Sequence, residues 1–168
     1  MTKESNLILS KNEIFQKLKR VAYEIYENNY LEKKLILAGI PDTGYKIAEI
    51  LIRELKEISP QELHLIKVNI NKQDPANSEI SLDCDIKLLK KAPLILVDDV
   101  LNTGRTFLYS LKPILEADVK KVQTAVLVYR GHSLFPISSD FTGYELSTTL
   151  NEHIEVVLDK GKEGVYLY

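Results

Sequence analysis

The chain has 168 residues, 27% charged and 45% hydrophobic, which suits a globular protein able to bury one sizeable core. Its formal net charge of −2 excludes the global basic excess of a dedicated nucleic-acid binder, so nucleic acid is not an expected partner. The single cysteine, Cys84, allows neither an internal disulfide nor a cysteine metal cluster. The sequence shows no signal-peptide core and no membrane-spanning apolar run, so we expect a cytoplasmic protein without a membrane partner.

The beginning of the chain predicts an amphipathic helix followed by a buried strand. Ser10-Lys11-Asn12-Glu13 is a capping box, in which the serine and glutamate side chains bind each other's free backbone N–H groups. Apolar residues at helical spacing continue to about Asn29, where the helix should end. LILAGI (35–40) is a short apolar run that stops at Pro41-Asp42-Thr43-Gly44, so it predicts a strand followed by a turn.

The middle of the chain predicts a further helix and two strands around a polar segment. Residues 44–58 have the spacing of an amphipathic helix, and LHLIKVNI (63–70) has the composition of a strand. NKQDPANSE (71–79) is polar and contains a proline, so we expect a mobile loop there. LILVDDV (94–100) is too short and too β-branched for a helix and predicts another buried strand.

The last part of the chain continues the alternation. A helix is predicted over 106–117, with Pro113 at a kink or near one of its ends. Strands are predicted over 122–130, 154–158 and 164–168. The segment 131–150 has neither period, so we expect a small irregular lobe that caps the sheet.

Strands that alternate with helices predict an α/β fold with a parallel, doubly wound sheet, here in one domain over residues 1–168. Ligands bind to such sheets beyond the carboxyl ends of the strands. Asp98 and Asp99 lie at the end of the strand predicted over 94–100, so that edge is the expected site.

The turn Thr103-Gly104-Arg105-Thr106 has the composition of a phosphate cradle. It leads into a helix, whose first N–H groups are free and lie at the positive end of the helix dipole. The glycine allows a ligand to approach the backbone, and the threonine hydroxyls add donors. The alternative is an ordinary helix start capped by Thr103. A Walker loop is excluded, because the sequence contains no G-x-x-x-x-G-K-[ST].

Asp98 and Asp99 are adjacent, so on a strand their side chains should point to opposite faces. Paired carboxylates suit the vicinal hydroxyls of a sugar, and they also suit a magnesium ion. The alternative is that one acid caps a helix while the other is a solvated turn residue. Two acids followed closely by a phosphate cradle favour a ribose 5-phosphate.

LILVDDVLNTGRT (94–106) resembles the 5-phosphoribosyl-1-pyrophosphate (PRPP) motif of type I phosphoribosyltransferases, in which two acids precede a TG-x-T turn. The resemblance implies that Asp98 and Asp99 are catalytic and contact the ribose hydroxyls, directly or through Mg²⁺ and water. It also implies that the 5-phosphate is held by a turn that we name the 5-phosphate turn: Asn102, Thr103, Gly104, Arg105 and Thr106.

RGHSLFPISSDFTGYELST (130–148) resembles a segment of the bifunctional pyrimidine operon attenuation and uracil phosphoribosyltransferase branch. This branch implies PRPP and a nucleobase, with uracil favoured, as substrates, a homodimer, and a base region at Tyr129, Arg130 and His132. It also implies a hood over about 131–150. The hypoxanthine-guanine branch is a second resemblance, through DFTGYEL, but that branch prefers an acid at the position of Asn102.

The turn that corresponds to the family's diphosphate-binding loop departs from the uracil-type pattern. We name it the diphosphate turn; it consists of Gly39, Ile40, Pro41, Asp42, Thr43 and Gly44. Both basic positions of the pattern are missing, and Asp42 adds a negative charge. A flexible loop over about 71–80 is expected to close over PRPP and to bring Lys72, where the attenuator branch has an arginine.

Three functions are compatible with these residues. The first is a phosphoribosyltransferase that uses PRPP and Mg²⁺. The second is a sensor that binds PRPP or a nucleotide without turnover, which the acidic diphosphate turn suggests. The third is an RNA-binding pyrimidine regulator, which the net charge of −2 disfavours. A general base at His132 is less favoured than a packing or hydrogen-bonding role, because phosphoribosyl transfer depends mainly on charge stabilisation and water exclusion.

Overall fold

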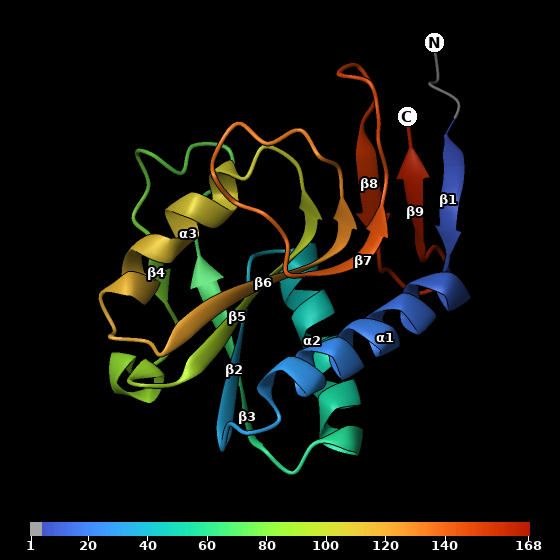
Figure 1. Cartoon of the computed structure of the whole chain (residues 1–168). Coiled ribbons are helices and arrows are strands. Elements are labelled where there is room, and N and C mark those ends of the chain that lie inside the picture. Colours follow the sequence, from blue (N-terminus) through green and yellow to red (C-terminus); the bar gives the residue numbers. More distant parts are fainter. Residues whose placement is uncertain (1–4) are drawn as a thin grey trace.

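The computed structural model of the chain describes residues 5–168 (Figure 1). The helices are α1 (Lys11–Asn29), α2 (Thr43–Ile58) and α3 (Arg105–Leu115), with a 3₁₀ turn η1 (Ile86–Leu89). The strands are β1 (Asn6–Ser10), β2 (Lys34–Gly39), β3 (Glu62–Asn69), β4 (Ser81–Leu82), β5 (Pro93–Leu101), β6 (Lys121–Tyr129), β7 (Phe141–Glu145), β8 (Ile154–Val157) and β9 (Gly164–Leu167).

The main sheet has the order β4-β3-β2-β5-β6-β7. Its central strands are parallel, and only the two-residue β4 runs antiparallel, against β3. Helices cover both faces of the sheet. Because successive side chains of a strand point to opposite faces, one strand contributes to the core on each side. On β2, Leu35 and Leu37 belong to the core cluster beneath α1 and α2, whereas Ile36 and Ala38 belong to the cluster beneath α3. The prediction of a doubly wound α/β sheet is therefore confirmed.

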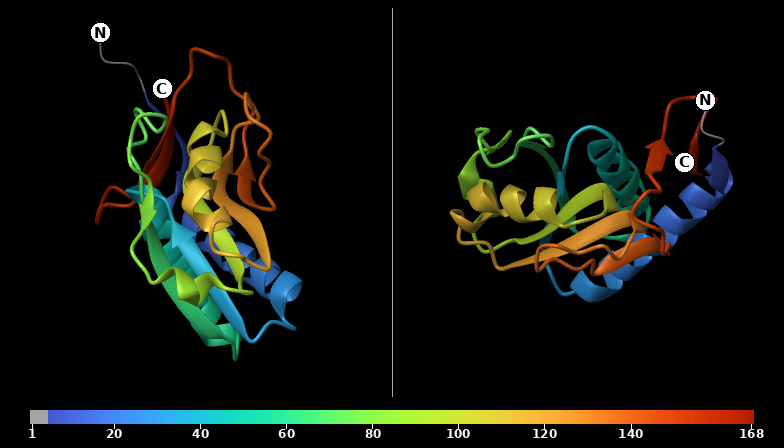
Figure 2. Two further views of the ribbon diagram at one scale, coloured as in Figure 1. Left: turned by 90° about the vertical axis from the view of Figure 1, so that its left-hand side faces the viewer. Right: turned by 90° about the horizontal axis from the view of Figure 1, so that it is seen from above.

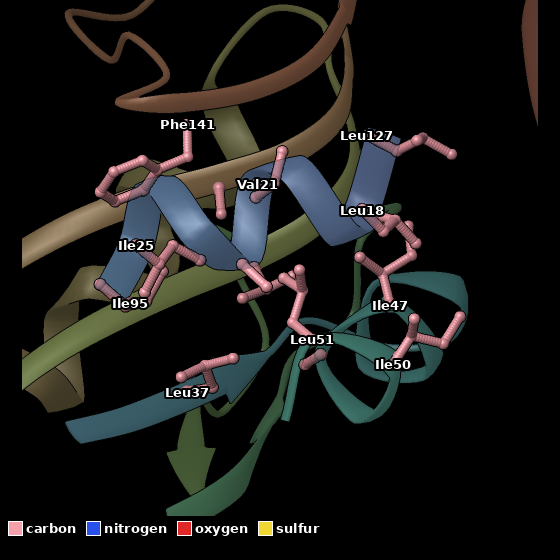
Figure 3. Close-up of a cluster of buried hydrophobic side chains, with 14 of the residues drawn as sticks. Leu18, Val21, Ile25, Leu37, Ile47, Ile50, Leu51, Ile95, Leu127 and Phe141 are labelled. Atoms are coloured by element: carbon pink, nitrogen blue, oxygen red, sulfur yellow. The ribbon is translucent and has the colours of Figure 1, made fainter. Parts of the chain in front are cut away.

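The larger core cluster joins the sheet to α1 and α2 (Figure 3). Leu18 and Ile25 of α1 and Leu51 of α2 are fully buried, as helical spacing predicts. They pack with Ile95 of β5 and Phe141 of β7. The predicted capping box at the start of α1 is present, with Ser10 and Glu13 each binding the other's backbone N–H. α2 is thus fixed firmly against the strands whose ends carry the acids.

A second, antiparallel sheet has the order β1-β9-β8 and lies at one end of the molecule, beside the start of α1 (Figures 1 and 2). It joins the two ends of the described chain, since Asn6 pairs with Leu167. Leu9, Ile154 and Val165 of this sheet are buried in the same cluster as α1 and α2. The strand β1 was not predicted from the sequence.

The irregular cap predicted over 131–150 is corrected in part. Phe141–Glu145 forms β7, a parallel edge strand of the main sheet beside β6, and the residues on either side of it are irregular. Asp140 fixes the start of β7, because one of its carboxylate oxygens accepts a hydrogen bond from the Thr124 backbone N–H at 2.8 Å. The small separate sheet is built instead from the ends of the chain.

Candidate active site

The two acids lie near the carboxyl end of β5, in the middle of the main sheet. Asp98 is only 3% exposed, and Asp99 is half-buried. Strand alternation predicts that they face opposite sides, but both carboxylates line one cavity of about 340 Å³. A single ammonium reaches both, since Lys72 Nζ lies 2.9 Å from Asp98 Oδ1 and 3.9 Å from Asp99 Oδ1. The turn that brings Lys72 there belongs to the polar segment after β3.

The electrostatics of this cluster depend on burial and on mutual charge. Burial raises the pKa of Asp98 well above its ordinary value, the negative charge of Asp99 raises it further, and Lys72 opposes both effects. Burial alone would lower the pKa of Lys72, but the charges of Asp98 and Asp99 outweigh it and the net pKa is raised. Lys72 therefore stays protonated as the counter-ion of the acid pair.

The 5-phosphate turn follows β5 directly. Gly104, with φ of 84°, is the N-cap of α3, and no side chain caps the helix there. The capping alternative is therefore not what the structure shows, although the Thr103 hydroxyl accepts a weak hydrogen bond from the Arg105 backbone N–H at 3.3 Å. A small cavity of about 50 Å³ lies against residues 101–107. An uncapped helix start beside a cavity is suited to an anion.

The segment after β6 supports this turn from the outside. The Thr103 carbonyl accepts hydrogen bonds from the backbone N–H groups of Leu134 and Phe135, at 2.9 and 3.0 Å. A Cβ added to Gly104 would lie 3.2 Å from the Ile137 Cβ, so the two segments are in close contact. The 5-phosphate turn is thus fixed before any ligand arrives.

Arg130 connects the end of β6 to the segment that precedes β8. It is 8% exposed, and its guanidinium donates to the Thr149 and Glu152 carbonyls at 2.7 and 2.6 Å and to the Thr148 hydroxyl. A longer bond of 3.5 Å reaches Asn102 Oδ1. Most of its donors are thus engaged by the protein, so Arg130 mainly positions the wall of the site.

His132 and Tyr129 differ in where they lie. His132 hydrogen-bonds through Nε2 to the Thr148 carbonyl at 2.8 Å, which fits a structural role. It lines a second cavity of about 360 Å³ together with Gly131, Leu134 and Leu150. Tyr129 packs against the core cluster beneath α3 and lines neither this cavity nor the one at the acid pair.

The cavity at His132 and the cavity at the acid pair are neighbours, because Asn102 and Arg130 line both. One holds the acid pair and Lys72, whereas the other lies between the 5-phosphate turn and the segment after β6. A ligand with a charged ribose part and a flat base part could therefore extend from one cavity to the next.

The diphosphate turn lies between β2 and α2, beside the acid pair. The fully buried Ile40 donates from its backbone N–H to the Val97 carbonyl at 2.8 Å, and the peptide bond between Pro41 and Asp42 is cis. Asp42 is the N-cap of α2 but makes no side-chain capping bond. A Cβ on Gly44 would lie 2.5 Å from Asp98 Oδ1, so only glycine allows α2 to start this close to β5.

Sequence reasoning missed four residues of the cavity that holds the acid pair: Gln73, Val100, His153 and Ile154. His153 comes from the far end of the chain and is held by a pair of backbone hydrogen bonds with Tyr168, at 3.0 and 2.9 Å. No local pattern around His153 points to this position, because it depends on the pairing of the small sheet.

The donor set fits a magnesium ion that arrives with its substrate. Two carboxylates are hard oxygen ligands, and Mg²⁺ is commonly held by one or two carboxylates together with substrate phosphates and water. Within residues 5–168 no three or more His, Cys, Asp or Glu side chains gather as a possible metal site. Substrate oxygens would therefore have to complete the coordination of a metal beside Asp98 and Asp99.

Within residues 5–168 no helix has the length and apolar character needed to cross a membrane.

The structure thus places two acids near the end of a central strand of a parallel sheet, directly before a helix start that no side chain caps. Residues 5–159 match the family model described as the phosphoribosyl transferase domain. The chain therefore belongs to the phosphoribosyltransferase family, and it is a transferase of the type I kind predicted from its sequence.

Curated relatives agree with this assignment over nearly the whole chain. The bifunctional protein PyrR of Ligilactobacillus salivarius (strain UCC118) is 36% identical, over 89% of this chain and 90% of its own length. The bifunctional protein PyrR of Fusobacterium nucleatum is 33% identical, over 99% of both chains. The predicted similarity to the attenuator branch is thus confirmed.

Solved structures show the same fold at much lower identity. The hypoxanthine phosphoribosyltransferase of Trypanosoma cruzi superimposes with a TM-score of 0.78 at 15% identity, over 96% of this chain and 95% of that one. A hypoxanthine-guanine phosphoribosyltransferase of Bacillus anthracis gives a TM-score of 0.75 at 13% identity, over 96% of both chains. At such identities the likeness concerns the fold and does not identify the base.

Proposed function

We propose that this phosphoribosyltransferase transfers the 5-phosphoribosyl group of PRPP to uracil, with Mg²⁺ and with release of diphosphate. The observation that carries the proposal is the placement of Asp98 and Asp99 in one cavity beside the uncapped start of α3. The acids would accept hydrogen bonds from the ribose hydroxyls, while the 5-phosphate turn would bind the 5-phosphate.

The reaction breaks the bond between ribose C1 and the diphosphate oxygen and forms a bond from C1 to a ring nitrogen of the base, whose proton is released to solvent. Positive charge develops on the ribose, so fixed carboxylates near the ring stabilise the transition state. The leaving group would be held by backbone N–H groups of the diphosphate turn, by Mg²⁺ and by Lys72. The base would lie in the cavity walled by His132 and Leu134.

Uracil is favoured over a purine by two observations. The curated relatives at 31–36% identity are PyrR proteins, the branch whose motif residues 130–148 resemble. Position 102 is an asparagine, and its Oδ1 faces the Arg130 guanidinium at 3.5 Å, so its amide N–H₂ is left to donate. An amide cannot deliver a proton to a purine nitrogen as a carboxylic acid can.

The proposal includes a homodimer, and it keeps the cytoplasmic location expected from the sequence. Support for a partner face comes from an apolar concavity of about 270 Å³ beside α3, which is lined by Leu108, Leu111, Leu115 and Phe135. Leu115 is 65% exposed there. Sedimentation equilibrium should give twice the chain mass of 19.2 kDa. A single species at the monomer mass would remove this part of the proposal.

The experiment that tests the activity is the exchange of labelled pyrophosphate into PRPP, measured with uracil, cytosine, hypoxanthine and guanine. We expect exchange with uracil that depends on Mg²⁺. Exchange with hypoxanthine alone would overturn the choice of base but keep the transferase. PRPP binding by calorimetry without exchange for any base would replace the enzyme with the sensor.

A further inference from the structure

Lys72 occupies a position that the ribose of PRPP would need. Its ammonium lies 2.9 Å from Asp98 Oδ1 and 3.9 Å from Asp99 Oδ1, at the two carboxylates assigned to the ribose hydroxyls. The Lys72 side chain is 32% exposed and that of Asp98 is 4% exposed, so the pair is largely shielded from water. A partly buried, charge-assisted contact of this length is a strong one.

The same ammonium has a second partner within reach once PRPP binds. Gly44 at the start of α2 lies against Asp98, so the diphosphate turn is immediately beside the acid pair. A lysine has a long flexible stem with three donors at its end, and it can exchange one anionic partner for another nearby. The diphosphate of PRPP would present several anionic oxygens at this place.

We propose that Lys72 determines ligand specificity by competing for the acid pair in the free protein, at a cost that only ligands with a diphosphate offset. PRPP displaces Lys72 from Asp98 and offers it new oxygen partners. Ribose 5-phosphate or a nucleoside monophosphate displaces Lys72 from Asp98 but offers its ammonium no diphosphate oxygen in return. This inference rests on the proposed function, because it assigns the diol and diphosphate positions from it.

The exchange of partners has a consequence for turnover. After transfer, diphosphate leaves and the monophosphate product remains without a partner for Lys72. The return of the ammonium to Asp98 and Asp99 then competes with the product's hydroxyls and favours its release. Lys72 thus favours substrate over product, because its contact with the acid pair opposes both ligands and its contact with diphosphate compensates only for the substrate.

Calorimetry with Mg²⁺ tests the inference by comparing two ligands, PRPP and ribose 5-phosphate. In Lys72→Gln we expect ribose 5-phosphate to bind about tenfold more tightly, because the block of one charge-assisted hydrogen bond is gone. PRPP affinity should change little, because the lost block and the lost diphosphate contact offset each other, so the preference for PRPP over ribose 5-phosphate falls about tenfold. Lys72→Arg keeps the charge and should keep most of the discrimination. Lys91→Gln is the matched control and should leave both affinities unchanged, because the exposed Lys91 ammonium pairs with Asp118 at 3.1 Å, outside the site.

The outcomes separate the inference from the proposed function. Equal weakening of both ligands in Lys72→Gln, with normal binding by the wild type, overturns the inference and leaves the proposed function intact. A wild type that binds neither ligand overturns both. Should Lys72→Gln unfold, a crystal structure of the wild type with Mg²⁺ and PRPP decides. Lys72 Nζ on a diphosphate oxygen supports the inference, and Lys72 Nζ still on Asp98 overturns it.

Discussion

The 5-phosphate turn and the diphosphate turn use one backbone device in two different charge environments. Each joins the end of a parallel strand to the start of a helix, β5 to α3 in one case and β2 to α2 in the other. The first turn contains no acid and is stabilised from outside by Leu134 and Phe135. The second carries Asp42 at the helix N-cap.

The difference predicts which of the two turns could bind an anion without a further cation. A helix start without a nearby acid offers free N–H groups and a favourable dipole to a phosphate. At the diphosphate turn, the charge of Asp42 offsets that dipole, so a multivalent anion needs a cation supplied from elsewhere. Mg²⁺ and Lys72 are the cations within the proposed site.

The largest effect is expected from the double variant Asp98→Asn, Asp99→Asn. It removes the charged acceptors that lie between the two turns, and we expect PRPP affinity in Mg²⁺ to fall by about 2–4 kcal/mol. Calorimetry measures this change in PRPP affinity. The matched control is Asp118→Asn with Asp159→Asn, two acids with exposed side chains outside the site, which should leave affinity unchanged. Undiminished PRPP binding by the first variant would end the ribose assignment.

A second large effect is expected from Gly44→Ala, which moves the diphosphate turn away from the acids. The new Cβ would lie 2.8 Å from the Asp98 Cα, and backbone on both sides leaves little room to relax. We expect the free energy of unfolding to fall by about 1–3 kcal/mol, as for other overpacked positions, and PRPP to bind more weakly. Thermal unfolding and calorimetry measure the two effects.

Gly161→Ala is the comparison for that variant. Gly161 has φ of 88° and nothing within 4 Å of an added Cβ, so alanine there causes backbone strain without a clash. It should lower stability by about 1–2 kcal/mol and leave PRPP binding unchanged. Loss of PRPP affinity in both variants would show that binding merely follows stability, which contradicts the close-contact argument.

The contrast between the turns also explains what the sequence could predict. Asp98, Asp99 and residues 102–106 lie close together in the sequence, so a local motif is enough to predict them as a site for a ribose phosphate. The contact of Lys72 with Asp98 spans 26 positions, and only the folded chain brings the two together. The sequence predicted Lys72 as a diphosphate ligand, and the structure places it on the acids.

The same reasoning applies to the fold. The doubly wound sheet could be predicted because its buried strands and amphipathic helices repeat clear patterns. β1 could not, because Leu7 is 57% exposed and its strand is defined by pairing with β9 at the opposite end of the chain. β7 was hidden in a segment rich in turn residues, where tertiary pairing with β6 outweighs local propensity.

A moderate effect on anion binding is expected from two single variants, one that removes the acid of the diphosphate turn and one that adds an acid to the 5-phosphate turn. Asp42→Asn should tighten diphosphate binding by about 0.5–1 kcal/mol, because it removes a repulsive charge at the start of α2. Asn102→Asp adds a charge to the 5-phosphate turn and should weaken sulfate or phosphate binding there by a similar amount. Calorimetry with diphosphate and with sulfate separates the two. Weaker diphosphate binding in Asp42→Asn would mean that Asp42 holds a metal instead of opposing the anion.

The smallest effect is expected outside both turns, at the ion pair of Lys11 with Glu163, whose atoms are 2.7 Å apart. The hydrogen bond from Lys11 lowers the Glu163 pKa from 4.5 to about 2. Because the folded pKa lies below the unfolded one, the pair stabilises the protein above pH 4.5, and this contribution is lost as pH falls towards 2. In urea titrations, the free energy of unfolding of the wild type should be slightly larger than that of Glu163→Gln at pH 6. This difference should disappear towards pH 2. Sulfate binding at the 5-phosphate turn, measured at pH 6, should be the same in both proteins. A gap that persists at pH 2 would mean that Glu163 acts through packing and not through its charge.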